Sequence, residues 1–240
     1  MNLAPFSVPA RRKTLVVLGA GASHGSRFAG ARCRGPRPPL DLGFFSELQR
    51  ASSAKPIEEL LQFVRKQFGP STTLSMEEFF SQVEYTNRFI QTLSVDRGPK
   101  VRRYQRALAW FYESLPLLFR EAIGERSCRY HEALARSLQT DDVVMSFNYD
   151  CLIDRALKEA AGNNWDPENM GYGYPVSEGG EAWKGESRGQ QPKRSITLLK
   201  PHGSMNWRIT NGTLALDHDP YEAATADGRI IPPTWFKALI

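Results

Sequence analysis

Cysteine is scarce in this sequence, and long apolar runs are absent. The 240 residues include three cysteines, Cys33, Cys128 and Cys151, and no Cys-x-x-Cys pair. This scarcity argues against a zinc ribbon and a disulfide framework, and it favours a location in the reducing cytoplasm. The apolar runs are far too short to cross a bilayer, and residues 1–13 lack the apolar block of a signal peptide. We therefore expect a cytoplasmic protein with no metal and no membrane contact.

Charge of one sign is in only mild excess. The net charge is +5, from 31 basic and 26 acidic residues, so direct nucleic-acid binding is not expected. One local cluster, Arg27, Arg32, Arg34 and Arg37, lies in a Gly/Pro-rich stretch. A solvated loop is the simpler explanation of this cluster. A loop that contacts phosphate or a partner is the alternative, because the cluster follows a Gly-rich turn.

The sequence does contain an alternation of strand and helix patterns. Short apolar, β-branched runs predict buried strands over residues 14–18, 142–147 and 195–199. Between the first two, residues 40–138 have helical patterns almost throughout, which predicts a helical insertion. This order predicts an α/β fold with a Rossmann-like, mostly parallel sheet, formed as one domain over residues 1–240.

Helices in the insertion are predicted over residues 40–51, 56–68, 76–93, 99–123 and 129–138. Ser75 and Glu78 form a capping box at the start of the third of these. A further helix is predicted over residues 149–160. Residues 163–194 are rich in Gly, Pro and charge and are expected to form a long loop. Asn211-Gly212 predicts a hairpin across residues 207–216.

The chain ends in a largely apolar segment, residues 230–240, without a polar tail. Natural termini are usually exposed and polar. We therefore expect either that the natural protein continues past Ile240 or that this end docks on a partner.

Glycine is concentrated where the first strand ends, in Gly19-Ala20-Gly21-Ala22-Ser23. Glycines at such a turn let backbone N–H groups approach a pyrophosphate near the start of a helix. The third glycine of the usual dinucleotide fingerprint is missing. Taken alone, the segment fits an ordinary strand-to-loop turn equally well.

The other two strands also end in polar side chains. Asn148 and Asp150 follow the second strand and offer groups suited to ribose hydroxyls, although capping of the next helix is the simpler alternative. His202 follows the third strand, between Pro201 and Gly203, and is a candidate general base. A turn histidine bonded to backbone is its alternative. Ligands bind at the carboxyl ends of parallel strands, so we expect the three strand ends to form one site.

Together these motifs resemble the sirtuin superfamily, and within it the bacterial sirtuin-like proteins associated with anti-phage defence. Gly19 to Ser23 resembles the first NAD loop of that family. Residues 146–150, Ser-Phe-Asn-Tyr-Asp, resemble its Asn-x-Asp element, and residues 200–207, Lys-Pro-His-Gly-Ser-Met-Asn-Trp, resemble its His-Gly element. Residues 231–235 resemble a segment downstream of that histidine. Pro201 replaces the usual leucine, and the family's later Gly-Thr/Ser loop for adenosine has no counterpart before Ile240.

The resemblance implies an NAD+ glycohydrolase (NADase), with NAD as its substrate, that acts in anti-phage defence by depleting NAD. The nucleotide-binding residues that it implies are Gly19, Ala20, Gly21, Ala22, Ser23, Asp150, Gly203 and Ser204. It implies that Asn148 orients the ribose or the attacking water and that His202 is the general base. The four-cysteine zinc module of the deacylases cannot be built from three cysteines, which favours hydrolysis. A homo-oligomer, or a complex with a sensor protein, is the expected assembly.

Two other functions fit the same motifs. A binding module could sense NAD or ADP-ribose without turnover, although the presence of both Asn148 and His202 argues against it. A protein deacylase or ADP-ribosyltransferase would consume NAD only with an acceptor protein. Cys151 follows Asp150 closely but has no evident His or Asp partner, so we expect a buried side chain there and no nucleophile.

Overall fold

The computed structural model describes residues 12–28, 35–69, 73–92, 99–185, 194–210 and 212–232. The predictions that concern Cys33, Arg32, Arg34, Asn211 and residues 233–240 lie outside these ranges.

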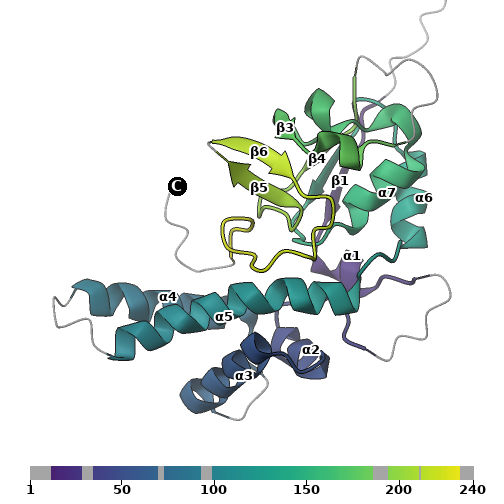
Figure 1. The fold of residues 1–240 in the computed structure, drawn as a ribbon. Coiled ribbons are helices and arrows are strands. Elements are labelled where there is room, and N and C mark those ends of the chain that lie inside the picture. The colour runs from purple at the N-terminus through teal and green to yellow at the C-terminus, as the bar shows by residue number, and fades with distance from the viewer. Residues whose placement is uncertain are drawn as a thin grey trace, which may run out of the picture.

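A parallel sheet of three strands lies in the upper part of the molecule (Figure 1). Its strands are β1 (Leu15–Leu18), β2 (Val143–Ser146) and β4 (Thr197–Leu199), in the order β1-β2-β4. Leu18 pairs with Ser146 and Met145 pairs with Leu199, so the carboxyl ends of all three strands meet at one edge. The three predicted strands and their parallel pairing are confirmed, in a mixed helix-and-strand fold compatible with the α/β class. The prediction that all three strands are buried is wrong for β1, which lies at the edge of this sheet, because its Leu15 and Val17 side chains are exposed.

Five helices lie between β1 and β2 in the part of the insertion that the structure describes. They are α2 (Phe44–Arg50), α3 (Lys55–Phe68), α4 (Met76–Thr92), α5 (Pro99–Ala122) and α6 (Arg129–Ser137). Helices α2 to α5 gather in the lower half of the molecule, where α5 packs against α3 and α4 (Figure 1). Their apolar faces share a buried aromatic cluster that includes Phe44, Phe45, Phe79 and Phe111. These aromatic side chains belong to a hydrophobic core that continues into β2, α7 and β4.

Helix α6 packs against α7 (Leu152–Ala160), and both lie beside the parallel sheet (Figure 1). We predicted that α7 starts at residue 149, and the observed start is three residues later. The reason is a local turn before the N-cap residue Cys151, in which the Asp150 carboxylate accepts a hydrogen bond from the backbone N–H of Leu152 at 3.0 Å. At α4 the predicted capping box is present, with Ser75 and Glu78 exchanging bonds of 2.9 and 3.0 Å.

The prediction of a long loop over residues 163–194 is wrong for its described part. That part holds the short helices η1 (Gly162–Asn164), η2 (Pro167–Gly171) and η3 (Gly180–Trp183) and the strand β3 (Val176–Glu178). Strand β3 pairs in parallel with β6 (Thr213–Leu216), which forms the predicted hairpin with β5 (Trp207–Thr210). Three buried aromatic side chains anchor the segment, namely Trp165, Tyr172 and Trp183. Composition alone does not reveal such anchors.

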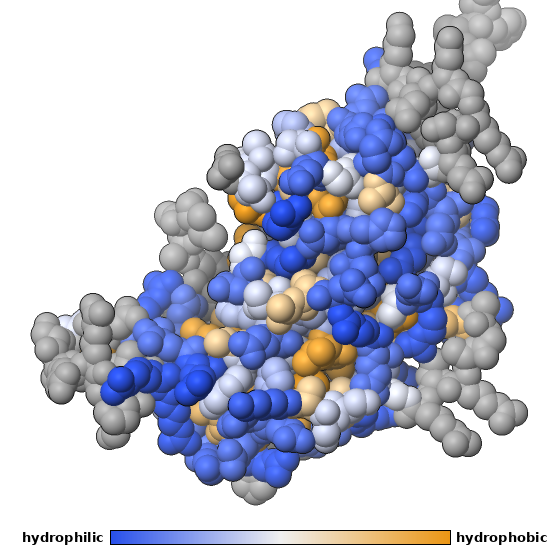
Figure 2. All heavy atoms as spheres, viewed as in Figure 1, coloured by the Kyte–Doolittle hydropathy of each residue, from blue (hydrophilic) through white to orange (hydrophobic). Residues whose placement is uncertain are grey.

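Hydrophilic residues dominate the face drawn in Figure 2, and apolar residues form only small patches on it. Within the described ranges, no helix combines the length and the apolar character needed to cross a membrane.

Candidate functional site

The Gly-rich segment after β1 is a short helix, α1 (Ala20–His24), where we expected a loop. Gly19 precedes it with extended backbone, at φ −110° and ψ −179°. A Cβ atom added at Gly19 or Gly21 would meet no atom within 4 Å. The glycines therefore relieve no backbone strain, and they leave open space beside the turn. Ser23, in the last turn of α1, is buried.

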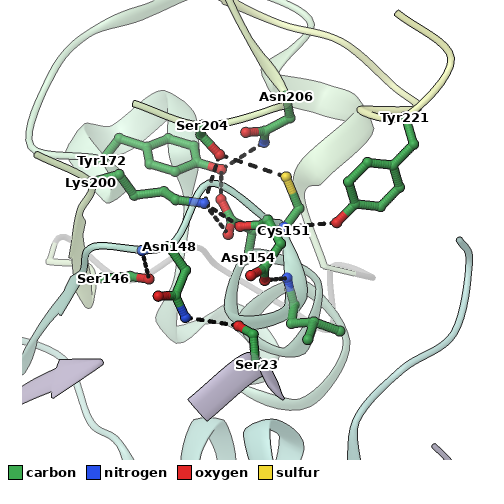
Figure 3. A network of polar contacts seen from close by, with 12 residues as sticks. Ser23, Ser146, Asn148, Cys151, Asp154, Tyr172, Lys200, Ser204, Asn206 and Tyr221 are labelled. Carbon is green, nitrogen blue, oxygen red and sulfur yellow. Dashed lines mark hydrogen bonds and ion pairs between the residues drawn. The ribbon is translucent and has the colours of Figure 1, made fainter. Parts of the chain in front are cut away.

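Asn148, just after β2, ties the first two strand ends together (Figure 3). Its Nδ2 donates to the backbone oxygen of Gly19 at 3.0 Å and to Oγ of Ser23 at 2.8 Å. Its backbone N–H donates to Oγ of Ser146 at 3.3 Å. The side-chain oxygen of Asn148 is buried and has no hydrogen-bond partner in the part of the chain that the structure describes. An unpaired buried acceptor is costly, so this oxygen is suited to a ligand hydroxyl or a water molecule.

His202 lies at the third strand end, in the turn after β4. Its half-buried ring contacts Phe147 edge-on, at 5.3 Å between centroids, and Tyr149 at 6.2 Å. The Tyr149 hydroxyl donates to the backbone oxygen of Ile231 at 3.0 Å. Burial, with smaller contributions from Tyr112 and Asp41, raises the pKa of Tyr149 well above its usual value. The phenol therefore stays protonated, and the two aromatic rings flank the imidazole.

These strand ends surround a cavity of about 280 Å³. Five predicted site residues line it: Ala20, Ser23, Asn148, Asp150 and His202. The other predicted residues, Gly19, Gly21, Ala22, Gly203 and Ser204, are not among its lining residues. Helix α5 closes one side with Leu115 and Phe119. The cavity is near the small end of the range of ligand pockets, about 300–1,000 Å³, so it suits half of a dinucleotide.

Asp150 has two structural roles. One carboxylate oxygen accepts a hydrogen bond from the backbone N–H of Leu152 in the turn before α7, and the residue also lines the cavity. The alternative that Asp150 is the cap of this helix is wrong, because the N-cap is Cys151 and its side chain makes no cap bond. Its buried position holds that carboxylate in one orientation.

Gly203 is held in the left-handed region, at φ +79°. A Cβ atom at this position would lie 2.2 Å from the backbone oxygen of Arg229. Gly203 forms an isolated bridge with Ile230, and the backbone N–H of Ile231 donates to the oxygen of His202 at 2.9 Å. The glycine thus lets residues 229–231 approach the turn and fix the backbone of His202.

Behind the cavity lies a buried ion pair that sequence reasoning missed (Figure 3). Nζ of Lys200 donates to Oδ2 of Asp154 at 3.0 Å, to the backbone oxygen of Asp150 at 2.6 Å and to Oγ of Ser204 at 2.6 Å. The side chains of Lys200 and Asp154 are both fully buried. Burial lowers the pKa of the Lys200 ammonium, but the nearby negative charges, with Asp154 the largest, outweigh it and raise the pKa overall. Lys200 is therefore a permanent cation that joins the second and third strand ends.

The network continues through Tyr172, whose hydroxyl donates to Oδ1 of Asp154 at 2.6 Å and accepts from Nδ2 of Asn206 at 2.9 Å. Cys151 is also buried, and its thiol lies 3.6 Å from Oγ of Ser204. Burial is the largest cause that raises the pKa of this thiol to about 12. The cysteine is protonated at neutral pH, in line with the prediction that it is no nucleophile. The one sequence signal for this network was an aspartate, Asp154, among the apolar residues of a helix.

The chain matches no protein-family model and no curated protein sequence. No group of three or more His, Cys, Asp or Glu side chains that could hold a metal occurs in the part of the chain that the structure describes.

Proposed function

We propose that this chain is an NAD+ glycohydrolase of sirtuin-like type, which cleaves the bond between nicotinamide and ribose. The observation that carries the proposal is the unpaired, buried oxygen of Asn148 at a cavity that it shares with Ser23 and His202. The motif resemblance to sirtuins and the parallel sheet with polar strand ends support the same proposal. Depletion of NAD in anti-phage defence, held in check by assembly or by a sensor partner, belongs to this proposal.

In the proposed reaction, nicotinamide leaves with the electron pair of the C1′–N bond, and water adds to C1′. The products are nicotinamide, ADP-ribose and one proton. Asn148 accepts a hydrogen bond from a ribose hydroxyl or from the water through its free oxygen, and His202 accepts the proton that is released. The bonds from Nδ2 to Gly19 and Ser23 hold the amide in place before substrate arrives. Such fixed dipoles stabilise the oxocarbenium-like charge that develops at C1′.

The test is release of nicotinamide from NAD by the full chain, compared with Asn148→Ala and His202→Ala. We expect loss of activity in both variants, on the order of a hundredfold or more, if each stabilises the reacting centre. Tight binding of NAD without any release would favour the binding module. NAD consumption that requires an acylated or acceptor protein would favour a deacylase or transferase.

A further inference from the structure

Two acidic residues that the proposed mechanism does not use also line the cavity. Asp41 precedes α2, and Glu77 lies in the first turn of α4, so both come from the helical block. Oδ1 of Asp41 accepts a hydrogen bond from the backbone N–H of Glu77 at 2.9 Å, and its backbone oxygen accepts from the N–H of Met76 at 3.1 Å. These bonds hold the backbone at the start of α4 against Asp41, so the two acidic residues are neighbours in the cavity lining, and we call them the acidic wall.

The charge around the cavity is one-sided. The acidic wall and Asp150 bring three carboxylates to the lining, which holds no lysine and no arginine among its described residues. The carboxylate of Glu77 makes no hydrogen bond or ion pair with any described residue. Three aromatic rings, of Phe119, Phe147 and Tyr149, complete the surroundings. Carboxylates together with aromatic faces favour a flat cation and disfavour an anion.

A second observation indicates that a ligand belongs in this cavity. Asn148, also in the lining, is 7% exposed, and its side-chain oxygen has no hydrogen-bond partner among the residues that the structure describes. A ligand bound in this cavity lies within the field of the acidic wall.

We propose that Asp41 and Glu77 are specificity residues that bind the positively charged pyridinium ring of the substrate. The wall attracts the ring and repels the diphosphate, so it admits the nucleotide with its nicotinamide end first. This inference rests on the proposed function for its substrate. It adds that the helical block, and not only the strand ends, selects the ligand by charge.

The kinetic test uses Glu77→Gln, which removes the charge and keeps the shape of the side chain. We expect KM for NAD+ to rise about three- to tenfold with a smaller change in kcat, because ground-state attraction is lost. Asp41→Asn keeps an acceptor for the N–H of Glu77 and is expected to behave alike. The matched control is Glu58→Gln, since Glu58 lies in the first turn of α3 and outside the cavity lining. An unchanged KM in both Glu77→Gln and Asp41→Asn would overturn the inference.

A binding test separates this inference from the proposed function. The probes are 1-methylnicotinamide, which is a cation, and nicotinamide, which has the same ring and carboxamide without the charge. We expect the full chain to prefer the cation in an NMR titration, and Glu77→Gln to lose most of that preference while Glu58→Gln keeps it. Equal binding of both probes by the unmodified chain would overturn the inference even if NAD is cleaved. If the chain prefers the cation but does not cleave NAD, the result would support the binding of the cation by Asp41 and Glu77. It would contradict only the proposed hydrolysis.

Discussion

Nδ2 of Asn148 donates a hydrogen bond of 2.8 Å to Oγ of Ser23, and so joins two strand ends that are 125 residues apart in the sequence. The bond fixes the amide of Asn148, which lines the cavity and whose oxygen has no hydrogen-bond partner among the described residues. Orientation of a polar group before the substrate binds is what makes it effective in a transition state. The account therefore assigns Ser23 a positioning role and Asn148 a direct one.

Substitution of Asn148 and of Ser23 should distinguish the direct role of Asn148 from the positioning role of Ser23. We expect Asn148→Ala to lower kcat about a hundredfold or more. Ser23→Ala leaves the bond from Asn148 to Gly19 intact, so we expect a loss of only about tenfold. Steady-state assays of nicotinamide release give both values. Ser26→Ala is the matched control, because that hydroxyl contacts only the backbone of Ala22 and lies outside the cavity lining. Equal losses in Ser23→Ala and Ser26→Ala would argue against the positioning role.

The buried ion pair should dominate the stability of the region behind the cavity. Lys200→Met leaves the carboxylate of Asp154 buried without its cation, so we expect the free energy of unfolding to fall by about 3–5 kcal/mol. The double variant Lys200→Met, Asp154→Leu removes both charges and should regain part of that loss. Urea denaturation measures all three proteins. A double variant less stable than Lys200→Met would contradict this account of the pair.

Burial lowers the pKa of His131 below its ordinary value of 6.5, although Asp150 and Asp154 oppose the shift. As the pH falls, His131 is therefore protonated at a higher pH in the unfolded chain than in the folded protein. The contribution to stability is complete above pH 6.5 and is lost below it, with a slope of at most about 1.4 kcal/mol per pH unit.

The variant His131→Phe should lack this pH dependence of the unfolding free energy. Its loss of Nδ1 breaks no hydrogen bond with any described residue, because this atom has no partner among them. Unfolding free energies between about pH 7 and pH 5.5 measure the effect. His218→Gln, at an exposed histidine, should keep the slope of the unmodified chain. An identical pH dependence in His131→Phe would show that another group titrates.

Two glycines with similar backbone angles give a further comparison. Gly203 has φ +79° and Gly212 has φ +75°, but only Gly203 has backbone atoms where a Cβ would lie. Gly212→Ala should cost about 1 kcal/mol of unfolding free energy from conformation alone. Gly203→Ala should cost about 3 kcal/mol more, since residues 229 and 230 must move. Thermal denaturation measures the stability of both variants. Equal losses of unfolding free energy would contradict the claim that the close approach of residues 229 and 230 requires glycine at position 203.

The sequence predicted the parts of the structure that depend on local pattern. Apolar runs indicated β1, β2 and β4. Because ligands bind at the carboxyl ends of parallel strands, the sequence also predicted that Asn148 and His202 lie at one site, and both line the same cavity. The pairing of Lys200 with Asp154 was not predictable, because 46 residues separate them and periodicity gives no partner for a buried charge. Glu77 was missed because the helical pattern of α4 does not show which of its polar residues line the cavity.

The central claim is tested most directly by incubation of the purified full chain with NAD, and by measurement of nicotinamide and ADP-ribose. We expect the unmodified chain and His218→Ala to release both products. We expect His202→Ala, with an unchanged melting temperature, to release them on the order of a hundredfold more slowly. NAD left intact by the unmodified chain, or cleaved by His202→Ala at the unmodified rate, would contradict the central claim.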